Sequence, residues 1–311
     1  MFAANFSSSK HRTKALTCLA HMLVACLSLA GAAGAHAEVS APDAAAALRA
    51  KYSELKEQLN SNQFKRPIHL DSTQASNELH GDIHAVVNYP FAKVSGALQG
   101  EAQWCDILSL HLNTKYCRPD TGPQGTVLHV NIGKKYDQPL PDTYQVNFIY
   151  RVAVAAPDYI KVLLNADSGP LGTNNYRIMF EAVALDSNST FIHLSYSYGF
   201  GMAGKLAMQV YLGTIGHSKV GFSVTGKQPN GHPEYIDGIR GLVERNTMRY
   251  YLAIESYLSA LSSPPQAQLE KRLHAWFSAT ERYPRQLHEM EENEYLGMKR
   301  MEYQRQQRAE S

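Results

Sequence analysis

Residues 143–155 carry the pattern that decides the fold, and they read Thr143-Tyr-Gln-Val-Asn-Phe-Ile-Tyr-Arg-Val-Ala-Val-Ala155. Apolar side chains fall at every second position from Tyr144 to Val154, and polar ones such as Gln145 and Arg151 stand between them. Strict alternation is typical of a β-strand with one buried face and one solvated face. The stretch therefore predicts a strand of an antiparallel sheet that is covered on one side.

Similar alternation continues outward from this stretch in both directions. It gives seven candidate strands, at 79–88, 125–134, 143–155, 158–166, 174–185, 189–199 and 217–225. The fifth and sixth are joined by Asp186-Ser-Asn-Ser189, residue types that favour tight turns, so these two strands should form a hairpin.

Helical spacing occupies much of the remaining chain. Pro90 opens a section with two short helices, one after Phe91 and one around Trp104. The longest helical pattern runs from Ile239 to Leu261, with apolar residues at steps of three and four, and two prolines after Ser263 end it.

The composition shifts along the chain predict four parts. These are an export signal at 1–37, a helical N-terminal extension at 38–78, a central ligand-binding domain at 79–262 and a charged helical tail at 263–311. The tail is expected to pack on the central domain, and a helix that binds an unidentified protein partner is the alternative.

The N-terminus has the three parts of a secretory signal. Basic residues such as Arg12 and Lys14 precede an apolar stretch, and Ala35-His-Ala37 offers a cleavage site before Glu38. We therefore expect an exported protein, periplasmic or secreted. A lipobox-like Leu23-Val-Ala-Cys26 leaves a second form of processing open, in which Cys26 is lipidated and the protein becomes an outer-membrane lipoprotein.

Export changes how the cysteines are interpreted. Of the four in the chain, Cys18 and Cys26 lie in the signal, and Cys105 and Cys117 remain. Two thiols in an oxidising compartment favour one disulfide, and two buried free thiols are the alternative.

Charge and motifs exclude several classes of function. A formal charge of +2 is too small for a protein that must neutralise many phosphates, so no nucleic-acid partner is expected. His80, Asp82 and His84 alternate along one strand, but they are too far apart to hold a metal without further ligands, so no metal is predicted.

Glycines at 199, 201 and 204 match a dinucleotide-binding pattern, but no acidic residue ends the next candidate strand, and no cofactor is expected. No catalytic motif is present either, and no catalytic residue is predicted.

The order of elements resembles the START-like, or helix-grip, superfamily, which includes START lipid-transfer domains, polyketide cyclases and the birch-pollen-allergen family. The likeness covers about 79–262. It rests on that order, on the strand that runs through Pro90 into a helix at Val86–Val94, and on the run from Arg245 to Leu252 in the last helix. It implies an α+β fold, with a curved seven-stranded antiparallel sheet wrapped around a long C-terminal helix and helical extensions at both ends.

The resemblance also implies a cavity between sheet and helix for an apolar small molecule, and the inner faces of the strands supply its candidate lining. The residues expected to contact the ligand are Tyr144, Phe148, Tyr150, Tyr176, Phe180, Tyr196, Tyr198, Asn246, Tyr250 and Ile254. A solid core that contains these same side chains is the alternative.

The segment 199–216 is rich in glycine and apolar residues. Met202, Leu206 and Val210 fall on one face of a helix there, which predicts a portal or flap beside the cavity that gates entry or touches a membrane surface. The function expected is therefore binding of a hydrophobic small molecule, a lipid or lipid-like metabolite, without catalysis. A cyclase- or hydrolase-type enzyme on the same scaffold and a filled-core structural protein are the alternatives.

Overall fold

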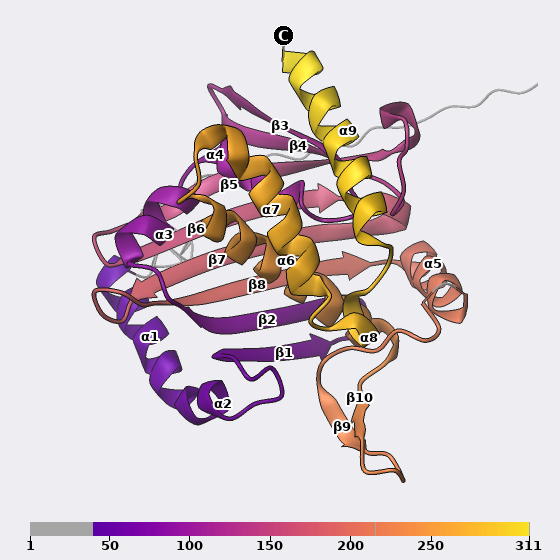
Figure 1. The fold of residues 1–311 in the computed structure, drawn as a ribbon, viewed down its shortest axis with the longest axis horizontal. Coiled ribbons are helices and arrows are strands. Elements are labelled where there is room, and N and C mark those ends of the chain that lie inside the picture. The colour runs from indigo at the N-terminus through magenta and orange to yellow at the C-terminus, as the bar shows by residue number, and fades with distance from the viewer. Residues whose placement is uncertain (1–39, 215, 311) are drawn as a thin grey trace, which may run out of the picture. The chain divides into compact units, whose positions relative to one another are not determined.

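The computed structural model describes residues 40–214 and 216–310, so the predicted signal at 1–37 lies outside the described residues. Eight antiparallel strands form the main sheet, in the order β1-β2-β8-β7-β6-β5-β4-β3 (Figure 1). Their bounds are β1 Ile68–Gln74, β2 Glu78–Val87, β3 Thr114–Gly122, β4 Gly125–Ile132, β5 Tyr144–Ala155, β6 Tyr159–Ser168, β7 Thr173–Ala184 and β8 Thr190–Phe200.

Helices surround this sheet, and a small hairpin projects from it. The helices are α1 Ala41–Glu54, α2 Lys56–Asn60, α3 Phe91–Leu98, α4 Glu101–Leu108, α5 Met202–Gly213, α6 Gly238–Ala260, α7 Pro265–Thr280, α8 Pro284–Leu287 and α9 Glu292–Glu310, with short turns η1 Leu140–Asp142 and η2 Pro170–Gly172. The hairpin pairs β9 Val224–Lys227 with β10 Pro233–Tyr235. None of the helices in the described part of the chain combines the length and the apolarity that a membrane span needs.

Six of the seven predicted strands are present, and the register confirms their predicted faces. Phe180 of β7 lies opposite both Val162 of β6 and Leu194 of β8, so the apolar sides of neighbouring strands coincide. Two further strands, β1 and β3, were not predicted, and β1 falls in the segment expected to be a helical extension. These two are the edge strands of the sheet. Because an edge strand pairs on one side only, it tolerates polar residues and even Pro119, and its sequence pattern is weak.

The seventh predicted strand, 217–225, is wrong. The segment does bury an apolar side chain, that of Phe222. However, the backbone N–H groups of Phe222 and Ser223 donate hydrogen bonds to the Glu244 carboxylate of α6 and not to a neighbouring strand. Residues up to 223 therefore form a loop bound to the long helix, and the last two residues of the predicted strand begin β9 of the hairpin.

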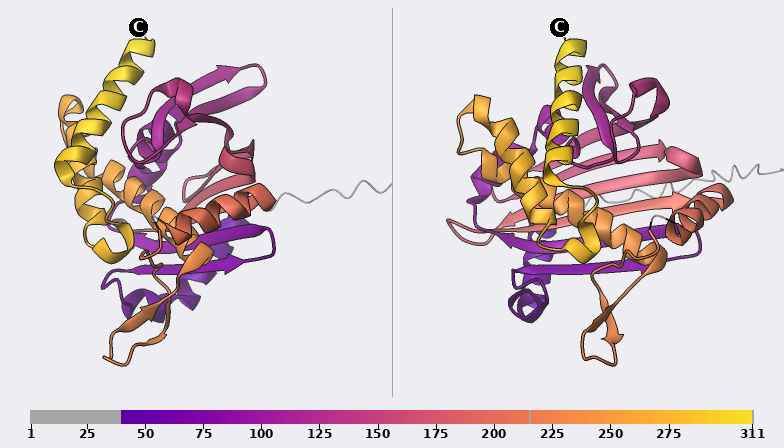
Figure 2. Two further views of the ribbon diagram at one scale, coloured as in Figure 1. Left: turned by 90° about the vertical axis from the view of Figure 1, so that its right-hand side faces the viewer. Right: turned by 45° about the vertical axis from the view of Figure 1, so that its right-hand side comes forward.

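The long helix α6 covers the inner face of the sheet at β1, β2 and β8. Figure 2 shows α6, α7 and α9 on the same side of the sheet. At the closest approach, a Cβ added to Gly81 of β2 would lie 2.4 Å from the Thr247 Oγ1 of α6. Glycine is therefore required at this position by the proximity of the helix.

The two extensions pack on the same sheet. Helix α1 lies on the face opposite α6, where Leu48 joins Tyr159 and Phe191 in a separate apolar cluster. In the tail, α7 packs on α6 and α9 crosses β3 (Figure 1). The predicted disulfide is confirmed, because Cys105 of α4 is bonded to Cys117 of β3.

Substitution of Gly81 by alanine should destabilise the protein by roughly 1–3 kcal/mol, because the new methyl group overlaps Thr247. Urea unfolding measures the loss, and the double variant G81A/T247A should recover most of it. The control is G96A in α3, where nothing lies within 4 Å of the added Cβ. A G81A protein as stable as G96A would show that the helix does not depend on this contact.

Candidate functional site

A cavity that is open to solvent lies between the inner face of the sheet and α6. It has an inner chamber of about 140 Å³ and an outer chamber of about 290 Å³. The chambers adjoin, because five residues line both of them: Asn113, Pro170, Tyr176, Tyr196 and Asn246. A third hollow of about 660 Å³ adjoins them at Pro170 and Leu171.

The place of the cavity follows from how the helices cover the sheet. At one end of the strands α3 and α4 fill the inner face, where the rings of Trp104 and Phe180 are 6.0 Å apart and the Tyr150 hydroxyl donates to the Gln99 carbonyl oxygen. At the other end α5 and η2 close the space beside β8 and α6 (Figure 1). These short elements leave the chambers unfilled.

Seven of the ten residues expected to contact a ligand line these hollows. They are Tyr144, Phe148, Tyr176, Tyr196, Tyr198, Asn246 and Tyr250. The other three, Tyr150, Phe180 and Ile254, belong to the solid core. Tyr150 and Phe180 lie at the end of the sheet that α3 and α4 fill, a distinction that alternation along a strand does not contain.

The lining is a connected group of aromatic rings. Tyr176 stacks on Tyr198 with centroids 5.3 Å apart, and Tyr196 lies 5.2 Å from Tyr250 of α6. Burial raises the pKa of Tyr196 and of Tyr198, so their hydroxyls stay protonated and can donate hydrogen bonds. Such rings offer apolar contact with polar hydroxyl groups at fixed points.

A histidine that no sequence pattern predicted lines the inner chamber. His111 is 4% exposed, its Nδ1 accepts the Asn113 backbone N–H at 3.1 Å, and its ring stacks on Tyr250. Burial, with the nearby Arg249 charge, lowers the pKa of His111 well below its usual range, so the ring is neutral. Because Nδ1 is an acceptor, Nε2 carries the proton. His111 follows α4 in a turn, where no periodic pattern marked it.

Arg249, Lys135 and Tyr211 also line the outer chamber without having been predicted. Arg249 follows Asn246 by one helical turn, a spacing that would have placed it on the same face. Lys135 lies in the loop after β4, and no local pattern ties that loop to α6.

The order of elements now identifies the architecture. Strand β2 leads into two short helices, five further antiparallel strands of one sheet follow, β8 closes the sheet beside β2, and the long helix α6 packs on its inner face. The fold is of the START-like, helix-grip class.

Comparisons with known proteins concern this fold alone. The sequence matches no protein-family model and no curated protein. A START superfamily protein from Mycobacterium smegmatis is 10% identical, with 44% of this chain and 90% of that one covered and a TM-score of 0.31.

Two similar structures are named as enzymes. A point mutant of norcoclaurine synthase from Thalictrum flavum is 17% identical over 46% of this chain and 91% of that one, with a TM-score of 0.32. An aromatase/cyclase from a Streptomyces species is 12% identical over 69% and 95%, with a TM-score of 0.31. At this level of identity and overlap the matches carry no information about function.

Helix α5 forms one wall of the START-like cavity and exposes apolar residues on its other side. Met208 lines the outer chamber, whereas Met202, Leu206 and Val210 are 90%, 63% and 59% exposed. The glycine pattern at 199–204 spans the end of β8 and the start of this helix. Because β8 is antiparallel to both neighbours, the pattern lacks the parallel crossover of a dinucleotide site.

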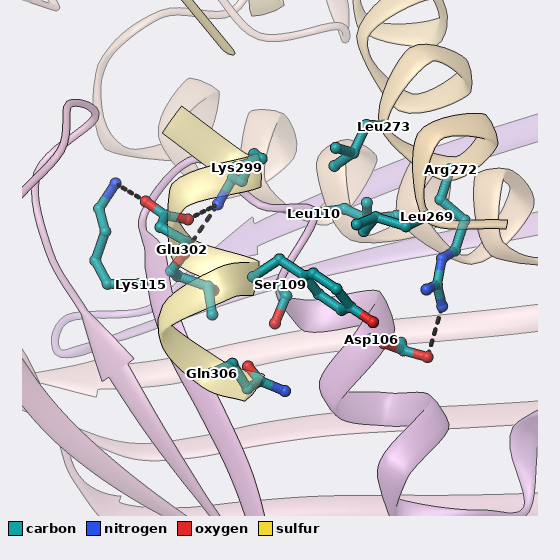
Figure 3. A pocket seen from close by; sticks show the side chains of 12 residues that line it. Asp106, Ser109, Leu110, Lys115, Leu269, Arg272, Leu273, Lys299, Glu302 and Gln306 are labelled. Carbon is teal, nitrogen blue, oxygen red and sulfur yellow. Dashed lines mark hydrogen bonds and ion pairs between the residues drawn. The ribbon is translucent and has the colours of Figure 1, made fainter. Parts of the chain in front are cut away.

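A separate hollow between α4, α7 and α9 is too small for an organic ligand. It measures about 30 Å³, room for a water molecule or two. Glu302 of α9 lies there between Lys115 and Lys299, at 2.9 and 2.8 Å from their Nζ atoms, as Figure 3 shows. This buried ion group attaches the tail to β3.

The opposite face of the sheet is less solvated than alternation predicted. His193 of β8 bridges Asp82 at 2.7 Å and Glu181 at 2.9 Å, and His80 binds Asp82 at 2.6 Å. No group of metal-ligating residues in the described part of the chain is arranged to hold an ion. Burial alone would lower the pKa of His193, but the hydrogen bonds that its ring donates to Asp82 and Glu181 raise it to about 9. This network is therefore a charged cross-strand tie between β2, β7 and β8.

The raised pKa of His193 predicts a pH-dependent stability. The protonated ring stabilises the folded state fully below its unfolded pKa of about 6.5, and this contribution is lost as the pH rises through about 9. H193Q should therefore lose roughly 2–3 kcal/mol of unfolding free energy at pH 6 and much less near pH 9.5. Urea unfolding at both pH values tests this, with H232Q, at an exposed position, as control. A loss equal at both pH values would contradict the assignment.

Proposed function

We propose that this chain is an exported binding protein for a hydrophobic small molecule, a lipid or lipid-like metabolite, held between the sheet and α6. The observation that carries the proposal is the pair of adjoining chambers in the otherwise filled START-like core. Their combined size falls in the range of small-molecule sites, roughly 300–1,000 Å³. A filled-core structural protein would not need them.

The chemistry of the lining supports a ligand that is mostly apolar. Aromatic rings from β5, β7, β8 and α6 surround the inner chamber, and the polar residues beside them are His111, Asn113, Thr114 and Asn246. A few fixed polar groups in an aromatic wall orient a ligand, whereas the rings supply the contact area.

Helix α5 supports a route of entry. It lines the outer chamber with one side and exposes Met202, Leu206 and Val210 on the other. An exposed apolar row beside a cavity suits contact with a membrane surface, from which an apolar ligand would be taken or to which it would be delivered.

Two features support export. The first is the signal-like sequence of residues 1–37, and the second is the Cys105–Cys117 disulfide, a bond that persists in oxidising compartments. They support a periplasmic or secreted location, and lipidation of Cys26 would place the same domain on a membrane.

His111 is the observation that favours an enzyme as the second candidate. It is the histidine of the inner chamber, where a proton carrier of a cyclase or hydrolase would stand. Its pKa lies well below the usual range, however, and a base that binds protons this weakly suits hydrogen-bond donation through Nε2 better than proton abstraction. Binding without turnover is therefore the primary proposal.

Native mass spectrometry and solvent extraction of the protein from its own host test the proposal. We expect a co-purifying apolar molecule, and we expect A207W to lose it, because the half-buried Ala207 of α5 lines the outer chamber and an indole there would fill it. Q209W places the same ring on the exposed side of α5 and should retain the molecule. An enzyme would instead release a mixture of substrate and product.

Uptake of the uncharged fluorescent probe N-phenylnaphthylamine provides a second readout. A wild-type protein with no extractable molecule and no probe uptake, or equal retention by A207W and wild type, would contradict a binding cavity.

A further inference from the structure

The outer chamber carries positive charge that the protein itself does not neutralise. Arg249 and Lys135 line it, and each contacts the same carboxylate oxygen of Glu289 at 2.7 Å. The Arg249 side chain is 3% exposed and that of Glu289 6% exposed. Burial would raise the pKa of Glu289, but the charges of Arg249 and Lys135 lower it, so the carboxylate is ionised.

Two further cations belong to the same group. Burial and the charge of Arg249 lower the pKa of Arg245, which is fully buried one helical turn away on α6. Burial, together with Lys135 and Arg249, also lowers the pKa of Lys219. Within the described residues, Glu289 is the single carboxylate that forms an ion pair with any of these four cations.

Arg249 also has a hydrogen-bond donor without an acceptor in the part of the chain that the structure describes. The Nη2 of Arg249 donates to Glu289, whereas its buried Nε makes no hydrogen bond to any described residue. A buried donor without an acceptor is unfavourable, and so is an excess of buried like charge. An anion in the outer chamber would offset that charge, and Arg249, which lines the chamber, would supply hydrogen-bond donors to it.

The size and lining of the inner chamber indicate what the other end of such a ligand would be. It holds about 140 Å³ and is lined mainly by aromatic and aliphatic side chains, among them Phe148, Val146 and Tyr250. An engineered apolar cavity of about 150 Å³ takes up benzene, so this chamber has room for one ring or a short branched chain.

We propose that the ligand is an amphiphilic organic anion, with an acidic head group on Arg249 and Lys135 in the outer chamber and a ring-sized apolar end in the inner chamber. This inference rests on the proposed binding function and adds the charge of the ligand to it. A carboxylate, a phosphate or a sulfonate would present the required oxygens.

Two fluorescent probes that differ by one acidic group distinguish the proposed anion site from the proposed binding cavity. Anilinonaphthalene sulfonate carries an acidic group, and N-phenylnaphthylamine has the same rings without it. We expect the wild-type protein to bind the sulfonate roughly tenfold more tightly or better, in a manner that A207W abolishes. Equal affinities would overturn the anion site and leave the binding cavity standing, whereas no A207W-sensitive binding of either probe would remove the cavity proposal itself.

Lys135 is the cation to vary, because its side chain is 24% exposed and Glu289 keeps Arg249 as a partner when Lys135 is lost. K135Q should weaken binding of the sulfonate by roughly tenfold and should change the affinity for N-phenylnaphthylamine much less. K271Q makes the same charge change at an exposed position of α7 and should alter neither affinity. Thermal unfolding of K135Q confirms that it is folded, and an unchanged ratio of the two affinities in K135Q would refute the anion site.

Discussion

The contact between α6 and the sheet is the constraint on which the rest of the structure depends. The apolar face of an open antiparallel sheet must be covered. In this chain the long helix α6 covers it over three adjacent strands, β1, β2 and β8. Close approach is achieved at Gly81, where any side chain would overlap Thr247. Because α6 lies so near β2 at this point, the rest of the inner face must be filled by other helices. Helices α3 and α4 fill it at one end of the strands, and α5 leaves the two chambers open at the other end.

The same helix organises the buried polar groups. Glu244 of α6 accepts hydrogen bonds from Ser72 of β1 and from the loop at Phe222 and Ser223, so one carboxylate holds an edge strand and the loop after α5 together. Two and five residues further along the helix, Asn246 and Arg249 line the outer chamber. Structural and ligand-facing polar residues therefore alternate on one element, and the precision of the site depends on the packing of α6.

Alternation predicted the interior of the sheet well and its edges poorly. Strands β5 to β8 have neighbours on both sides and a covered face, so their residues obey a period of two. The edge strands β1 and β3 each pair with one neighbour only, so their pattern is weak. The segment 217–225 was mistaken for a strand because Phe222 is buried, although Glu244 of α6 binds its backbone. For the site, the aromatic lining followed from the faces of the strands. The division between lining residues such as Tyr196 and core residues such as Phe180 did not, because it depends on which helix lies above each.

What the sequence by itself determined is the set of local patterns: the inner strands and their apolar faces, the long helix, and two cysteines placed to be bonded. Each depends on neighbours a few residues apart along the chain, which a period of two or of three to four records. Only the tertiary structure decided where the cavity lies and what charge it holds. Lys135, Arg249 and Glu289 come from three segments far apart in sequence, and the chamber is the space that the packing of α3, α4 and α5 leaves open. Neither leaves a local pattern, because both result from contacts between distant parts of the chain.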